Sequence, residues 1–148
     1  MTNYKGYTFE YHHKFKKEFT KIQSKHQCPT LKSDFKLLYD ILIQHLHESD
    51  RFSPHVCMHI SGLENYVTVP VFIIKRFRCE GINKGANSGF RITFLFDAEE
   101  SRFIFVEMFN KNKKSIPDKK RINELFKKEI SISNELYPDE ENYLKNSK

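Results

Sequence analysis

The segment FRITFLFDAEESRFIFVEMF, residues 90–109, decides the fold class. Aromatic and aliphatic side chains alternate with other residues over 90–96, which predicts a β-strand with one buried face. Residues 102–109 are apolar almost throughout and predict a second strand, central in its sheet and covered on both faces. The short link DAEES favours an antiparallel hairpin between the two.

Two further strands are predicted upstream of this hairpin. Residues 67–79, VTVPVFIIKRFRC, are rich in β-branched and aromatic side chains. Residues 4–11 place aromatic side chains at alternate positions, which suits a short first strand. The sequence thus predicts an antiparallel sheet.

Three helices complete the pattern. Apolar residues recur at helical spacing in 12–26 and again in 34–48, where Ser33 is a candidate N-cap. A short linker joins these two helices, which predicts a helical hairpin. Ser115 and Asp118 match a capping box ahead of a C-terminal helix over 119–130.

These elements predict an α+β domain. A short N-terminal strand and a helical hairpin pack on an antiparallel sheet, and a C-terminal helix follows. We expect one domain over residues 1–130 and a polar, acidic tail over 131–148. One sheet face is expected to stay uncovered and free for function.

The charge of the chain is uneven. The formal net charge is +6, and residues 71–128 hold 14 basic and 7 acidic side chains. Such a basic block favours a polyanionic partner, nucleic acid or an acidic protein, although it also suits a merely solubilising surface.

Cysteine usage and hydropathy suggest a cytoplasmic protein. Cys28, Cys57 and Cys79 are scattered and include no Cys-x-x-Cys motif, which favours reduced thiols. No apolar leader or membrane-length run is present. His55, Cys57 and His59 alternate, but their spacing suits ordinary loop residues better than a metal site, and no metal is expected.

The segment from Ile73 to Ile122 resembles the core of the RelE/ParE toxin superfamily. The resemblance rests on a basic strand, a glycine-containing turn, and Ser88-Gly89-Phe90-Arg91 opening the next strand. The run Val106-Glu107-Met108-Phe109 then leads into a lysine-containing loop. An upstream Phe-Lys-Lys helix at residues 15–17 is also similar, so the likeness covers roughly residues 7–128.

This resemblance implies a toxin of a type II toxin–antitoxin pair. Many members of the superfamily cleave mRNA, commonly on the ribosome, and so inhibit translation, whereas the ParE branch inhibits DNA gyrase. It also implies a cognate antitoxin protein as partner and requires neither a metal nor a small-molecule cofactor. Without a metal, RNA is cut when the neighbouring 2′-hydroxyl attacks the phosphate, and cationic donors stabilise the charge that develops.

The candidate site residues follow from the resemblance and from strand parity. Arg91 points away from the apolar side of its strand, and the matching arginine of the family contacts the scissile phosphate. The predicted catalytic residues are Arg91, Arg78, Arg76 and Lys111. The predicted substrate-binding residues are Lys75, Lys84, Lys113 and Lys114. Each is also compatible with a solvated strand or turn.

Three functional hypotheses stay open at this point. The first is a ribosome-dependent endoribonuclease (mRNA interferase). The second is a ParE-like gyrase inhibitor without nuclease activity, which the lack of an obvious general acid and base favours. The third is a catalytically inactive, basic RNA- or protein-binding domain.

Overall fold

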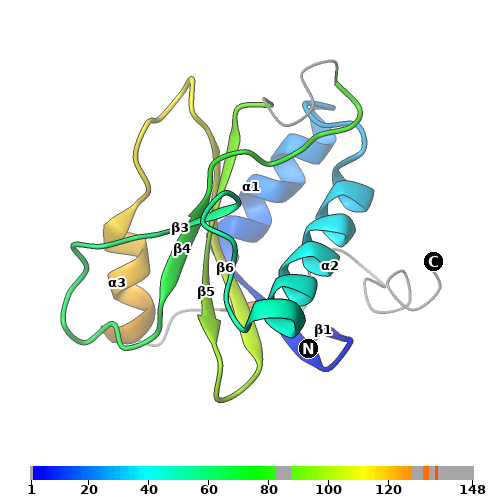
Figure 1. The fold of residues 1–148 in the computed structure, drawn as a ribbon. Helices are drawn as coiled ribbons and strands as arrows, with labels where there is room; N and C mark the ends of the chain where they lie inside the picture. The colour runs from blue at the N-terminus through cyan, green and yellow to red at the C-terminus, as the bar shows by residue number, and fades with distance from the viewer. Residues whose placement is uncertain (1, 83–87, 128–131, 134–135, 137–148) are drawn as a thin grey trace.

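A computed structural model describes residues 2–82, 88–127, 132–133 and 136 of the chain. One sheet lies between two helices on one side and a third helix on the other (Figure 1), so the α+β class is confirmed. The elements in chain order are β1 (Thr2–Tyr4), β2 (Tyr7–His12), α1 (His13–Ser24), α2 (Leu31–Ser49), β3 (Cys57–His59), β4 (Val71–Ile74), β5 (Phe90–Asp97), β6 (Arg102–Asn110), α3 (Lys119–Lys127) and β7 (Ile132–Ser133).

The sheet is mixed, which corrects the expectation of a purely antiparallel one. Its order is β1-β2-β6-β5-β4-β3, and β7 pairs with β2. Strand β2 runs parallel to β6, while the other neighbours are antiparallel. A parallel pair needs a long connection, and here α1, α2 and the rest of the sheet supply it. Strand β6 is central, as predicted.

The sheet face under α1 and α2 is an aromatic core. Phe9 of β2 stacks on Phe103 of β6, its register partner, with ring centroids 4.9 Å apart. Phe35 of α2 packs edge-on against Phe105 of β6 at 5.3 Å. Because aromatic pairs bury large areas and prefer stacked or edge-on geometry, this cluster holds the helical hairpin on the sheet.

The opposite face is covered as well, so the expectation of a free sheet face is wrong. A second cluster of buried side chains lies there, composed of Ile60, Val71, Ile73, Leu95, Ile104, Val106, Phe109 and Ile122. Helix α3 and the segment 60–70 close over it, joined by a hydrogen bond from the Glu64 amide to the Asn123 side chain of 3.3 Å. The apolar residues of β4, β5 and β6 on this face require such a cover.

A β-bulge in β6 sets which side chains face which layer. Thr93 pairs with Glu107 but Phe94 pairs with Phe105, so Val106 is the extra residue. A bulge switches the alternation of side chains along the strand. Phe105 and Met108 therefore both join the aromatic core. Glu107 is thereby directed away from the aromatic rings, toward α3.

The N-terminal strand and one helix start differ from the sequence prediction. The first strand is a hairpin, β1 with β2, whose turn residues Lys5 and Gly6 both have positive φ (53° and 89°), as tight hairpin turns require. Helix α2 begins at Leu31, so Ser33 is not its N-cap; the Ser33 hydroxyl donates to the Thr30 carbonyl at 2.9 Å.

The start of α3 and the end of the chain also differ. Asp118 caps α3 by accepting the Arg121 amide at 3.0 Å, so the capping residue is Asp118 rather than Ser115. Beyond residue 130, β7 pairs with β2 and Leu136 is buried in the aromatic core. Part of the expected tail thus packs with the domain. No described helix is both long enough and apolar enough to cross a membrane.

Cys28 and Cys79 form a disulfide, so the expectation of three reduced thiols is wrong for this pair. Their Cα atoms lie 6.0 Å apart, within the ordinary range for a disulfide. Their separation of 51 residues left the pairing invisible in the sequence. Cys57 is free and buried, and burial raises the pKa of its thiol to about 12.

Candidate nucleic-acid interface

The far half of β6 has an edge that none of the described strands covers, and two side chains close it. Strand β2 pairs with β6 only as far as Phe105. Beyond that point the Met108 amide donates to Glu18 of α1 at 3.1 Å, and the Val106 carbonyl accepts from Arg121 of α3 at 2.9 Å. A buried backbone group without a partner is costly, so these contacts replace the missing strand.

Glu18 and Arg121 also bind each other. The guanidinium of Arg121 donates from both terminal nitrogens to the two carboxylate oxygens of Glu18, at 2.9 and 3.0 Å. Burial alone lowers the pKa of Arg121, but the hydrogen bonds and charge of Glu18 outweigh it, and the pKa is raised. Arg121 is therefore a permanent cation, and the Glu18–Arg121 pair ties α1 to α3 around the edge of β6.

Glu107 is a buried carboxylate just inside this edge. Its side chain is 3 % exposed and forms an ion pair with Lys114. Its other oxygen accepts the Asp118 amide at 2.8 Å, at the start of α3. Both carboxylate oxygens are therefore occupied, and Glu107 holds the lysine-containing loop and α3 in place.

Arg91 and Lys114 lie near the same aromatic side chain. Arg91 of β5 is the register partner of Phe109, and the ammonium of Lys114 lies 5.3 Å from the centre of the Phe109 ring. The Arg91 guanidinium donates to the Ser115 carbonyl at 3.3 Å. Arg91 is half-buried and points away from the aromatic core, as strand parity predicted, but the face on which it lies is covered by α3 and not free.

Lys111 and Lys113 are exposed on the loop that follows β6, which we call the lysine loop (residues 110–115). The Lys111 amide donates to the Gly89 carbonyl at 2.9 Å. Gly89 has φ +88°, and a Cβ there would meet the Asn110 side chain at 3.2 Å. Only glycine fits this position without strain, so the Gly-Phe-Arg element anchors the lysine loop beside Arg91.

A cleft of about 340 Å³ opens beside the lysine loop. Its charged lining residues are Glu18, Lys21, Glu107, Lys113, Lys114 and Arg121. The acidic members are both paired with cations, so the side chains that remain for a ligand are basic. Such a cleft suits an anionic group such as a phosphate.

The remaining predicted residues lie elsewhere or outside the described chain. Strand β4 ends at Ile74, so Lys75, Arg76 and Arg78 are exposed residues of the following segment rather than strand residues. Arg76 and Arg78 line a small pocket against α2, and Arg78 forms an ion pair with Glu80. They are therefore on the helical-hairpin side, whereas Arg91 is on the α3 side. Lys84 lies outside the described residues.

Sequence reasoning missed Glu18 and Arg121 as a pair. They are 103 residues apart, and each lies in a helix that carries several lysines. One signal in the sequence could have pointed to Arg121. It directly precedes Ile122, a core position of the helix, and an arginine beside the apolar side of a helix can turn its side chain toward the core.

A larger cavity, of about 670 Å³, is separate from this cleft. Its lining is mostly apolar and includes Phe52, Met58, Phe72 and Phe96, between the end of α2 and strands β3 to β5. It contains none of the predicted site residues. The smaller cleft has the charged groups that anion binding needs, and we place the candidate interface there and on the adjoining lysine loop. Lys113 and Lys114 line this cleft, whereas Arg91 and Lys111 lie outside it.

No known protein family, curated protein or solved structure matches this chain.

Proposed function

We propose that this protein is a toxin that acts on RNA in the manner of RelE-type nucleases. It cuts mRNA on the ribosome without a metal ion, acts in the cytoplasm, and is neutralised by an antitoxin protein. The observation that supports this best is that Arg91 and Lys114 lie at Phe109, next to the lysine loop that carries Lys111 and Lys113. These four are among the eight residues that were predicted for phosphate binding and catalysis from the resemblance and strand parity.

In this proposal Arg91 and Lys111 stabilise the reacting phosphate. When the 2′-hydroxyl attacks, negative charge builds on the phosphate oxygens, and fixed cationic donors lower the energy of that state. The ion pair with Glu107 and the anchor at Gly89 hold the lysine loop before RNA binds. Lys113 and Lys114 grip neighbouring phosphates. Arg76, Arg78 and Lys75, on the other side, contact more distant parts of the RNA or ribosome.

The second candidate function is a ParE-like toxin without nuclease activity. The state of Glu107 favours this alternative. Among the described residues Glu107 is the one buried carboxylate near Arg91, and its two oxygens are occupied by Lys114 and the Asp118 amide. A general base needs a free lone pair within reach of the 2′-hydroxyl. In this alternative the same basic surface binds DNA gyrase.

The test is a cell-free translation reaction with a defined mRNA, in which new 5′ ends are mapped after the protein is added. Codon-phased cleavage that requires ribosomes is expected from the wild type. Arg91→Ala should lower the cleavage rate about 100-fold, the scale of one lost charge-stabilising donor. Arg51→Ala is the matched control, because Arg51 is an exposed arginine that lines the apolar cavity instead.

Intact mRNA with undisturbed translation would contradict the nuclease proposal. A gyrase supercoiling assay on the same samples then distinguishes the second candidate. Equal cleavage rates for Arg91→Ala and the wild type would show that Arg91 is not a site residue, but would still support nuclease activity.

A further inference from the structure

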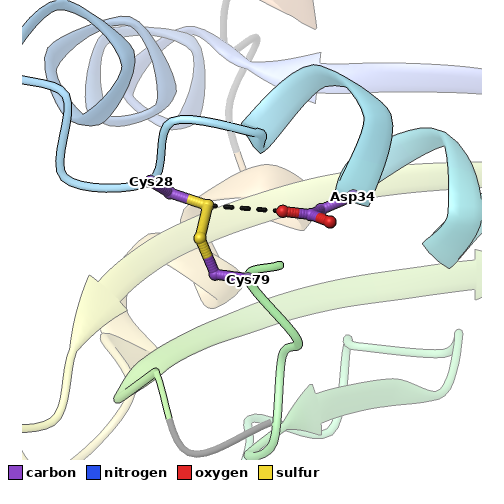
Figure 2. A group of neighbouring side chains, drawn as sticks. All are labelled: Cys28, Asp34 and Cys79. Atoms are coloured by element: carbon purple, nitrogen blue, oxygen red, sulfur yellow. Dashed lines mark hydrogen bonds between the residues drawn. A yellow bond between two sulfur atoms is a disulfide. The ribbon is translucent and has the colours of Figure 1, made fainter. Parts of the chain in front are cut away.

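The Cys28–Cys79 disulfide lies beside a buried carboxylate. Cys28 is in the link between α1 and α2, Cys79 follows β4, and Asp34 is in the first turn of α2, with its carboxylate turned toward the sulfur atoms (Figure 2). All three residues are at least nine-tenths buried. One ligand atom from each lies within 4.8 Å of the other two.

The carboxylate is held in this position by other groups. The Thr30 hydroxyl donates to Asp34 Oδ2 at 2.6 Å, and the Glu80 amide donates to the same oxygen at 3.2 Å. That oxygen lies 3.5 Å from Cys28 Sγ. A disulfide sulfur carries no proton, so this contact brings no hydrogen bond while the cysteines are oxidised. The Thr30 and Glu80 hydrogen bonds therefore hold the carboxylate facing the two sulfurs.

We propose that Cys28, Cys79 and Asp34 bind one Zn²⁺ ion when a dithiol reductant opens the disulfide. In the first step the disulfide takes up two electrons and two protons and becomes two thiols, while the dithiol is oxidised to its own disulfide. Zn²⁺ then displaces the two thiol protons to solvent and binds the two thiolates and the carboxylate. This inference does not depend on the proposed function.

The geometry suits a tetrahedral zinc site. Zn–S bonds of about 2.3 Å and a Zn–O bond of about 2.1 Å place a sulfur and an oxygen ligand about 3.6 Å apart. The observed separation of Cys28 Sγ and Asp34 Oδ2 is 3.5 Å. The two sulfurs need to move to about 3.8 Å from each other, which side-chain rotation allows across a Cα–Cα distance of 6.0 Å.

The ligand chemistry selects zinc over the hard cations. Two thiolates are soft donors, which favour zinc, whereas Mg²⁺ and Ca²⁺ require oxygen ligands. With three protein ligands, water takes the fourth position. No other group of three such ligands comes this close within the described part of the chain.

The site would keep the two segments of the chain cross-linked in either redox state. Oxidised or metal-bound, Cys28 and Cys79 join the α1–α2 link to the segment that follows β4. A cytosolic reductant would therefore exchange one cross-link for another rather than remove it, provided that zinc is present.

The experiment compares the full-length protein in both redox states. Reduced protein is prepared with dithiothreitol, which is then removed without oxygen, and Co²⁺ is added as a coloured substitute for Zn²⁺. The reduced wild type should bind one Co²⁺ with a thiolate-to-metal charge-transfer band that Zn²⁺ abolishes, while the oxidised protein should show none. The zinc-loaded protein should show two sulfur ligands by X-ray absorption.

Variants assign the ligands. Cys79→Ser should remove the charge-transfer band, and Asp34→Asn should weaken Zn²⁺ binding about 10-fold or more. Cys57→Ala is the matched control and should bind as the wild type does, since Cys57 is not in the group. A reduced wild type that is folded by circular dichroism and shows no band would overturn the proposal. The proposal would also be overturned if Cys57→Ala lost the charge-transfer band while Cys79→Ser kept it. Unchanged Zn²⁺ affinity in Asp34→Asn would exclude Asp34 as a ligand and overturn the proposed site as well.

Discussion

The two faces of the sheet are covered by different kinds of side chain. The face under α1 and α2 is filled by rings such as Phe9, Phe35 and Phe105, all almost fully buried. The face under α3 has a smaller, mostly aliphatic core, and its border carries Glu107, Lys114 and Arg91. We infer that the aromatic face supplies most of the stability, while the α3 face positions charged groups for a ligand.

The largest expected effect tests this difference in the cores. Phe105→Ala should lower the free energy of unfolding by about 4 kcal/mol, because it leaves a cavity among several rings. Ile122→Val on the α3 face removes one methylene from a fully buried side chain and should cost about 1 kcal/mol. Urea unfolding followed by circular dichroism measures both.

Ile116→Ala is the control, because Ile116 is 70 % exposed and its loss should change little. A loss for Ile122→Val as large as that for Phe105→Ala would contradict the inference, because one methylene of the α3 face would then matter as much as a whole ring of the aromatic face.

A somewhat smaller effect concerns the contact between the two faces. Arg121→Met should cost about 3 kcal/mol, since it leaves Glu18 without its partner and the Val106 carbonyl without a donor. The double variant Arg121→Met with Glu18→Gln should lose less than the sum of the single losses, because the two side chains form one unit.

Additive losses in this double-mutant cycle, again by urea unfolding, would mean that the two residues act independently. The Glu18–Arg121 pair would then be a surface contact of little value.

The smallest of the three effects is pH-dependent and involves His12, where β2 meets α1. His12 is 1 % exposed, and its Nδ1 accepts the Lys14 amide at 3.0 Å. Burial, aided by the positive charges of His13, Arg121 and Lys14, lowers the pKa of His12 from 6.5 to about 4. The folded protein thus holds this imidazole neutral at a pH at which the unfolded chain is protonated.

Stability should therefore fall as the pH drops from about 6.5 toward 4, because the unfolded state binds the extra proton in that window. From pH 7.5 to pH 5 the contribution of His12 is about 2 kcal/mol. His12→Asn keeps a side chain that can cap α1 and removes the titration. Thermal unfolding across this range should show a shallower pH dependence for His12→Asn; identical slopes would exclude His12 as the cause.

Much of the fold was predictable because it depends on local patterns. The alternating aromatic residues of 90–96 identified β5 and its buried face, and helical spacing identified α1, α2 and α3. The parallel pairing of β2 with β6 was not predictable, since register between distant strands leaves no local trace. The bulge at Val106 was equally invisible, and it alone decides that Glu107 points toward α3.

The candidate site was predictable only in part. Parity placed Arg91 opposite the aromatic face because β5 includes that residue. The same argument failed for Arg76 and Arg78, since β4 ends at Ile74, before either. The disulfide and the Glu18–Arg121 pair each join residues separated by more than 50 positions. Such contacts are created by the fold and have no pattern in the sequence.

The backbone amide of Met108 is a probe of how helix α1 detaches from the sheet. Its hydrogen is bonded to the Glu18 carboxylate and not to a strand carbonyl, and Glu18 is in turn held by Arg121. Detachment of α1 would release this one proton to exchange with deuterium, whereas detachment of α3 would remove only Arg121, which holds the acceptor. Hydrogen exchange at Met108 therefore reports the opening of α1, and a β6 amide within the β2 pairing reports the whole sheet.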